Sequence, residues 1–195
     1  GYGGPLIDAP LSPETQRIFM EELRTYCLEQ HIVTQFLRYH PLLDNHGVVS
    51  PMTETRYLRD TIYMDTASPE LILANMDSKN RNMVRKAQRS GVTVREAPMS
   101  EYAPFLDLYR QTMDKHGAED YYTFDTSYFD YLSEHLYDHA FLLYAELEET
   151  PISGAIFFRT NGTMHYHLAG SDAACRNLAA GNLLLYEAAL WGAAH

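Results

Sequence analysis

The stretch "TMHYHLAGSDAACRNLAAGNLLLYEAALW" (residues 163–191) carries the most information about the fold. Residues 163–171 read as a strand, and the apolar run over 182–191 reads as a helix. A polar turn with one basic residue, Arg176, separates them. A strand that passes through such a turn into an apolar helix indicates an α/β domain.

The residues before this stretch extend the same domain. Residues 140–147 and 152–160 have the β-branched and aromatic content of strands, and Asn161-Gly162 is a strong hairpin signal. A short strand over 92–98 and two helices, over about 100–117 and 126–139, come earlier. This order predicts a mixed α/β sheet with flanking helices and no repeated βαβ array.

Two helix starts lie within the first 70 residues of the chain. Ser12-Pro13-Glu14 predicts a helix over about 13–30, and Ser68-Pro69-Glu70 opens a helical region over about 69–89. Residues 31–43 and 55–66 have the composition of strands. The chain begins without methionine and ends inside a helical pattern, so we expect a fragment that is truncated at both ends.

The composition of the chain argues against several classes of protein. The chain has 195 residues, a formal net charge of -11 and a pI near 5.2, which argues against a general nucleic-acid or membrane-surface binder, so that any polyanion must meet a local basic patch. Neither an apolar run of about 20 residues nor a signal segment is present, so no transmembrane segment is predicted. Cys27 and Cys175 lie far apart, which predicts no disulfide framework and a reducing, cytoplasmic compartment.

Several segments together carry a family resemblance: "GYGGP" (1–5), "RYHPLL" (38–43), "DSKNRNMVRKAQRSGVTV" (77–94) and "MHYHLAGSD…NLLLYEAALW" (164–191). The combined pattern resembles the FemAB and BioF2-like branch of the GNAT (GCN5-related N-acetyltransferase) superfamily. Members of this branch contain two tandem GNAT-like halves. The resemblance implies that residues 1–67 are the C-terminal part of the first half, 68–91 a connecting basic helical region, and 92–195 the N-terminal part of the second half.

The resemblance also implies an activity, N-acyl transfer. An amine of a peptidoglycan or other bacterial cell-envelope precursor, or another small amine, would attack an acyl or aminoacyl group. The donor would be acyl-CoA or, as the alternative, aminoacyl-tRNA. A rival hypothesis is a catalytically silent GNAT-like ligand-binding domain, and a third is a purely structural partner-binding domain.

The turn over residues 176–181 is similar to a coenzyme A-binding pattern of GNAT enzymes, except for alanine at 179. Unpaired amides at a helix N-terminus and residues without bulk let a pyrophosphate approach the backbone. The alternative is an ordinary helix start in which Asn177 or Asp172 caps and the alanines pack. The predicted cofactor-binding residues are Arg176, Asn177, Ala179, Ala180 and Gly181.

The predicted strand over 163–171 supplies the candidates for proton transfer. Regular alternation places His165, His167 and Ala169 on one face and Tyr166 on the other. Either histidine could accept the amine proton, and Tyr166 would orient the acceptor or fill the core. The alternative is a pair of hydrogen-bonded histidines on a half-buried strand. No third ligand accompanies them, so no metal site is predicted.

Two further segments are predicted to bind substrate. Five basic residues within eleven positions form a landing site for the phosphate of a nucleotide-linked precursor or of tRNA, or a solvated face that neutralises nearby acids. The aromatic stretch 121–131 suits an acceptor cleft, with Tyr122 and Asp125 as binding residues, or packs against the core. An incomplete sheet would expose strand edges, which favours a homodimer. The basic residues are Lys79, Arg81, Arg85, Lys86 and Arg89.

Overall fold

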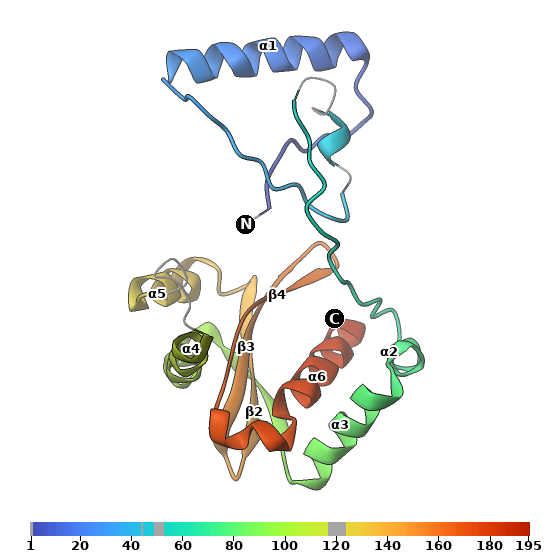
Figure 1. Ribbon diagram of the computed structural model, residues 1–195, viewed down its shortest axis with the longest axis vertical. Coiled ribbons are helices and arrows are strands. Elements are labelled where there is room, and N and C mark those ends of the chain that lie inside the picture. Colours follow the sequence, from blue (N-terminus) through green and yellow to red (C-terminus); the bar gives the residue numbers. More distant parts are fainter. Residues whose placement is uncertain (1, 44, 49–52, 117–123) are drawn as a thin grey trace. The chain divides into compact units, whose positions relative to one another are not determined.

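The computed structural model describes residues 2–43, 45–48, 53–116 and 124–195 (Figure 1). The chain divides into two compact units, Gly1–Tyr63 and Met64–His195. The predicted division into two GNAT-like halves stays a prediction. The basic helical region that we expected to connect them lies within the second unit.

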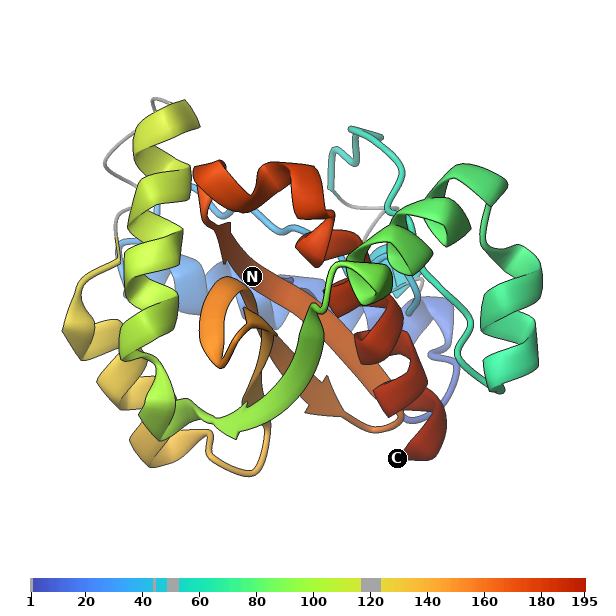
Figure 2. The ribbon, with the colours of Figure 1, turned by 90° about the horizontal axis from the view of Figure 1, so that it is seen from below.

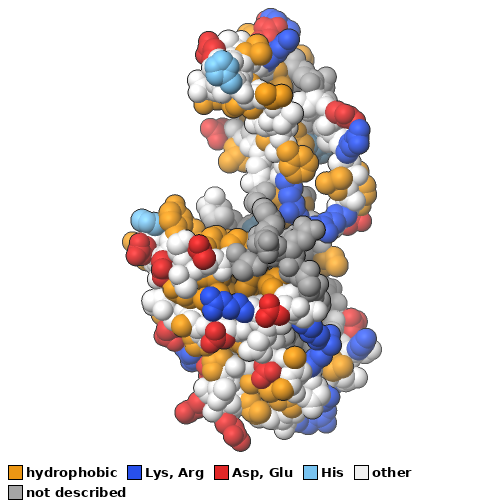
Figure 3. Space-filling model, turned by 60° about the vertical axis from the view of Figure 1, so that its left-hand side comes forward, with side chains coloured by type: hydrophobic (Ala, Val, Ile, Leu, Met, Phe, Trp, Pro, Cys, Tyr) orange, Lys and Arg blue, Asp and Glu red, His pale blue; other side chains and the backbone are white. Residues whose placement is uncertain are grey.

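The first unit is built around helix α1 (Pro13–Glu29) and the short 3-10 helix η1 (Asn45–Val48). Helix α1 begins where the sequence predicts, because the Ser12 hydroxyl accepts a hydrogen bond from the Thr15 amide at 3.1 Å. No residue of α1 is buried. The unit exposes many hydrophobic side chains (Figure 3), among them Leu6 and Phe36.

The strands predicted over 31–43 and 55–66 were wrong. The described residues of these stretches form a single bridge, between Tyr39 and Gly3. Val33 and Ile62 are 94% and 97% exposed, so the apolar side chains that suggested strands have no sheet face to cover. A strand needs a hydrogen-bonded neighbour, and composition does not show whether one is at hand.

The second unit contains a four-stranded antiparallel sheet in the order β1-β2-β3-β4, so each strand pairs with its successor in the sequence (Figure 1). Asn161 and Gly162 have φ of 46° and 70°, which confirms the predicted hairpin turn. The predicted mixed α/β sheet with flanking helices is thereby confirmed. The strands are β1 (Thr93–Pro98), β2 (Ala140–Leu147), β3 (Thr150–Thr160) and β4 (Thr163–Ser171).

Helices cover both faces of this sheet (Figure 2). Helices α3 and α6 pack on one face, and α4 and α5 on the other. The predicted helical region 69–89 is two helices, because the Asp77 carboxylate caps a new helix by accepting from the Asn80 amide at 2.7 Å. The helices are α2 (Pro69–Asn75), α3 (Ser78–Arg89), α4 (Ala103–His116), α5 (Thr126–His135) and α6 (Ala180–Ala194). Short 3-10 helices are η2 (Met99–Glu101) and η4 (Ala173–Leu178).

Strand β2 lies between two hydrophobic clusters, which explains why residues 140–145 are all apolar or aromatic. Phe141 and Leu143 belong to the cluster under α3 and α6, whereas Leu142 and Tyr144 belong to the cluster under α4 and α5. The Tyr144 hydroxyl donates to the Glu101 carbonyl at 2.7 Å, so its polar tip is satisfied in the core. None of the helices that the structure describes is long and apolar enough to cross a membrane.

Candidate active site

The first element of the candidate site is the turn Arg176–Gly181, here called the donor turn. Helix η4 ends at Ala179, which has the left-handed values φ 58° and ψ 32°, and α6 begins at the next residue. The Asp172 carboxylate caps η4 by accepting from the Ala174 amide at 2.8 Å, but α6 has no side-chain cap. The alternative of an ordinary capped helix start therefore describes η4 and not α6.

The start of α6 presents unpaired donors. Within the described residues, the amides of Ala180 and Gly181 make no hydrogen bond. A Cβ built on Gly181 would meet only the Ser153 hydroxyl, at 4.0 Å, so the space beside this backbone is open. Free amides at the positive end of a 15-residue helix are a typical anion-binding arrangement.

The side chains of the donor turn divide between surface and core. Arg176 and Asn177 are exposed, and neither side chain has a hydrogen-bond or ion-pair partner among the described residues. Ala180 is 6% exposed and packs into the cluster under α6. Arg176, Asn177 and the Gly181 backbone are therefore the groups that a bound anion could contact, while Ala180 supports the helix.

The second element is β4, where the structure corrects the predicted alternation. Leu168 lies opposite Ile156, but Tyr166 lies opposite Phe157, so His167 is the extra residue of a β-bulge. The bulge places His167 and Leu168 on the same face and moves Ala169 to the other. A bulge depends on pairing across the sheet, which a single strand's sequence does not reveal.

His167 is held by aromatic residues of the α5 side of the sheet. Its Nε2 lies 2.5 Å from the Tyr128 hydroxyl, and its ring centroid lies 4.3 Å from that of Phe158. Burial, with a contribution from nearby His165, lowers the pKa of His167 to about 4. Burial also raises the pKa of Tyr128. At neutral pH, therefore, both groups are uncharged, and the tautomer of His167 decides which of them donates.

The depressed pKa predicts a specific pH dependence of stability. The unfolded chain, in which a histidine has a pKa of about 6.5, binds more protons than the folded one between about pH 6.5 and 4. The contribution of His167 is fully present above this window and is lost as the pH falls through it. Because His167 is partly exposed, we expect this contribution to the free energy of unfolding to be only about 1 kcal/mol. Urea unfolding at pH 7 and pH 4.5 measures the loss of unfolding free energy between the two pH values. This loss should be smaller in His167→Gln than in the wild type, and an equal loss would contradict the lowered pKa of His167.

The other two predicted site residues on β4, His165 and Tyr166, lie on different faces of the sheet. His165 is partly buried and pairs opposite Phe158, which places it on the same face as His167. Tyr166 is 53% exposed and its ring lies 5.5 Å from that of Phe157, on the opposite face. The two histidines thus share a face, as predicted, and Tyr166 does not join them.

The basic residues of α3 form a surface beside the donor turn. The Asn182 amide of α6 donates to Asn80 Oδ1 at 3.0 Å, so the first turns of the two helices are neighbours. Arg81 is partly buried and donates to the carbonyls of Leu73 and Met76, which gives it a role in joining α2 to α3. A groove of about 180 Å³ lies beside it and is lined by Leu73, Arg81, Val84, Arg85, Gln88 and Tyr186.

The predicted aromatic acceptor segment is described only in part, and Tyr122 lies outside the described residues. Asp125 caps α5: its carboxylate accepts from the Ser127 hydroxyl at 2.5 Å and from the Tyr128 amide at 3.3 Å, and these bonds lower its pKa. Phe124 stacks on Tyr128 with ring centroids 4.4 Å apart. Phe124, Tyr128 and Phe129 therefore pack against the core, whereas Tyr131 is 57% exposed and Asp125 is engaged locally.

Sequence reasoning missed the bond between Tyr128 and His167, whose residues stand 39 positions apart. The aromatic content of residues 121–131 was a signal that something packs there, but it did not name the partner. No group of three metal-ligating side chains occurs among the described residues.

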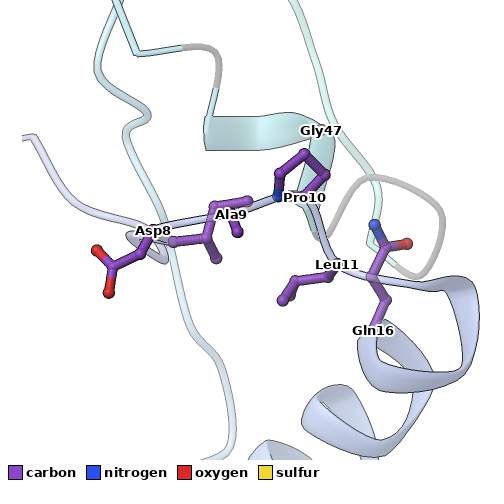
Figure 4. Close-up of a pocket in the computed structure, with 7 residues that line it drawn as sticks. Asp8, Ala9, Pro10, Leu11, Gln16 and Gly47 are labelled. Carbon is purple, nitrogen blue, oxygen red and sulfur yellow. The ribbon is translucent and has the colours of Figure 1, made fainter.

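A separate hollow of about 410 Å³ lies in the first unit (Figure 4). Its lining is mostly apolar, with Asp8 and Gln16 as the polar side chains, and the Asp8 carboxylate points away from Leu11 and Gln16. This arrangement does not bring reactive groups together, so it adds nothing to the candidate site.

Comparisons with known proteins agree with the fold. A family model described as the FemAB family matches residues 43–150. No curated protein matches the chain. A solved structure described as "Crystal structure of FemX" is similar with a TM-score of 0.67 and 13% identity, and the match covers 93% of this chain and 66% of that one. The chain thus spans 66% of the length of that structure, and the likeness supports the mixed α/β fold.

Proposed function

The chain belongs to the FemAB family, and from this premise we propose that it is part of an N-acyltransferase that transfers an aminoacyl group to an amine of a peptidoglycan precursor. The observation that carries the proposal is the uncapped start of α6, where two amides without a hydrogen bond among the described residues follow exposed Arg176 by four and five positions. These groups suit the phosphates of a donor. Acyl-CoA is the alternative donor, because a pyrophosphate would use the same groups.

The proposed reaction is a direct displacement. The acceptor nitrogen attacks the carbonyl carbon of the donor ester or thioester, so a C–N bond forms and a C–O or C–S bond breaks. The amine loses a proton, and the leaving oxygen or sulfur gains one. No covalent enzyme intermediate is needed, and burial together with the nearby Asp172 raises the pKa of the Cys175 thiol, which makes it a poor nucleophile.

The two histidines have different parts in this proposal. A pKa of about 4 makes His167 a weak base at neutral pH, and its Nε2 is already bonded to Tyr128. We assign it the role of holding Tyr128 and the bulged backbone of β4. His165, on the same face, is then the candidate to take the amine proton, while Tyr166 lies on the opposite face and has no part in this step.

A transfer assay with two donors tests the proposal. The chain is incubated with a nucleotide-linked muramyl peptide and either radiolabelled acetyl-CoA or radiolabelled aminoacyl-tRNA, and the label in the peptide is counted. Transfer from aminoacyl-tRNA is the expected result, and transfer from acetyl-CoA alone would change the donor. Donor binding without any transfer would favour the catalytically silent binding domain.

A further inference from the structure

Strand β4 lies at the edge of the sheet, and its last residue is bound from the side on which no strand lies. β4 is last in the order β1-β2-β3-β4, so one side of it has no strand partner among the described residues. The backbone N–H and C=O of Ser171 point to that side, since the next amide, of Asp172, donates to Ile152 of β3 at 2.9 Å. Backbone groups that point outward at a sheet edge need a partner from water or from a side chain.

The side chain of Thr112, on α4, supplies this partner. The Ser171 amide donates to Thr112 Oγ1 at 3.0 Å, and the same hydroxyl lies 3.4 Å from the Ser171 carbonyl oxygen. The hydroxyl hydrogen has a nearer acceptor, the Leu108 carbonyl oxygen at 2.9 Å, which leaves the oxygen lone pairs for the Ser171 amide. One side chain thus joins α4 to the last residue of β4.

The residue before Ser171 explains how α4 comes close enough. Gly170 has no side chain, and a Cβ built on it would lie 2.5 Å from the Leu108 carbonyl carbon, one helical turn before Thr112. From the side of β3, the buried Ser153 hydroxyl donates to the Gly170 carbonyl oxygen at 3.2 Å. The end of β4 is therefore held between β3 and α4 by two hydroxyl groups.

The donor turn continues from this end of β4. Asp172 follows Ser171 directly, and its carboxylate caps η4 by accepting from the Ala174 amide at 2.8 Å. Helix η4 has no buried residue, so its position depends mainly on the elements at its two ends. One of these is α6, which packs against the sheet, and the other is the last residue of β4. A shift of Ser171 would therefore move Asp172, η4 and Arg176.

We propose that Thr112 is a positioning residue for the donor turn: its hydroxyl fixes the end of β4, and thereby the place of η4 and Arg176. The part of this inference that concerns the reaction rests on the proposed function. Thr112 acts through Ser171 and Asp172 and does not need to touch the donor. Because the donor phosphates do not react, a displaced turn weakens donor binding and leaves the rate of the chemical step almost unchanged.

Three variants separate the hydroxyl from the rest of the side chain. Thr112→Val removes the hydroxyl and keeps the branched shape and a similar helix propensity, whereas Thr112→Ser keeps the hydroxyl. The matched control is Thr25→Val on α1. The Thr25 hydroxyl donates to the Glu21 carbonyl oxygen at 2.9 Å, as the Thr112 hydroxyl does to that of Leu108, and it holds no strand among the described residues.

Hydrogen–deuterium exchange of the 195-residue chain, followed by NMR without any donor, measures whether Thr112 holds the turn. The informative amides are those of Asp172 and Ala174, whose own acceptors the substitution leaves in place. In Thr112→Val we expect both to exchange at least about fivefold faster, the effect of one lost hydrogen bond, while the amides of β2 keep their rates. Thr112→Ser and Thr25→Val should stay within about twofold of the wild type. Unchanged exchange in Thr112→Val, or equal acceleration throughout β2, would overturn the inference.

The transfer assay measures the consequence for the reaction. In Thr112→Val, the KM for the donor should rise at least about fivefold, with kcat and the KM for the acceptor within about twofold of the wild type, and Thr112→Ser should restore the donor KM. A fall in kcat with an unchanged donor KM would overturn the positioning role. If the wild type transfers nothing, the proposed function fails, whereas the exchange rates still decide whether Thr112 holds the turn.

Discussion

Replacing Gly170 with alanine is expected to lower the free energy of unfolding of the unit Met64–His195 by about 3 kcal/mol or more. At this residue β4 touches the backbone of α4: an added Cβ would lie 2.4 Å from the Tyr109 nitrogen and 2.5 Å from the Leu108 carbonyl carbon. Backbone atoms inside a helix cannot rotate away as a side chain can. The helix must therefore move off the sheet, which opens the cluster that holds Phe105 and Phe129.

Urea unfolding followed by circular dichroism measures this effect. The matched control is Gly181→Ala in the same unit, where the added Cβ would meet only a hydroxyl at 4.0 Å. We expect the control to have unchanged or slightly higher stability, since alanine favours a helix over glycine. If Gly170→Ala were as stable as the control, α4 would not lie against β4 as described.

Replacing Gly181 with valine is expected to reduce acyl transfer by at least about 100-fold while the fold persists. The side chain would occupy the open space beside the free amides at the start of α6, which is the space that the donor phosphates need. Because an added Cβ would meet no atom outside the neighbouring backbone closer than the Ser153 hydroxyl, at 4.0 Å, the substitution should leave the free energy of unfolding almost unchanged. Loss of activity without loss of stability separates a binding role from a structural one.

A matched substitution at the other end of α6 controls for effects on the helix itself. Ala194 is exposed in its last turn, and Ala194→Val should transfer at the wild-type rate. The two variants are compared by initial rates of transfer and by urea midpoints. A Gly181→Val protein that transfers at the wild-type rate would show that no donor lies against these amides.

Local signals in the sequence predicted the elements of the second unit well. The Asn161-Gly162 turn set the register of a hairpin, and Ser68 marked the residue before α2, because turns and caps depend on neighbouring residues only. The same kind of local reasoning failed for residues 31–43. Whether a β-branched stretch becomes a strand depends on a partner elsewhere in the chain.

The candidate site, too, was predictable only where it depends on neighbouring residues. The donor turn follows from small residues at a helix start, so residues 176–181 could be found from the sequence. The pairing of His167 with Tyr128 could not, because it depends on a bulge in β4 and on the packing of α5. Nor could the sequence show that Arg81 is engaged by backbone carbonyls, whereas the other basic side chains of α3 form no ion pair with any residue that the structure describes.

Calorimetric titration shows whether the donor turn binds the phosphates of the donor. Wild-type protein, Arg176→Ala and the control Arg110→Ala are each titrated with acetyl-CoA and with an RNA hairpin that carries a non-hydrolysable aminoacyl group. We expect one of these donors to bind the wild type and the control equally, and to bind Arg176→Ala about tenfold more weakly, a loss of about 1.4 kcal/mol. Equal affinity of all three proteins for the donor, or no binding of either donor, would contradict binding of the donor at this turn.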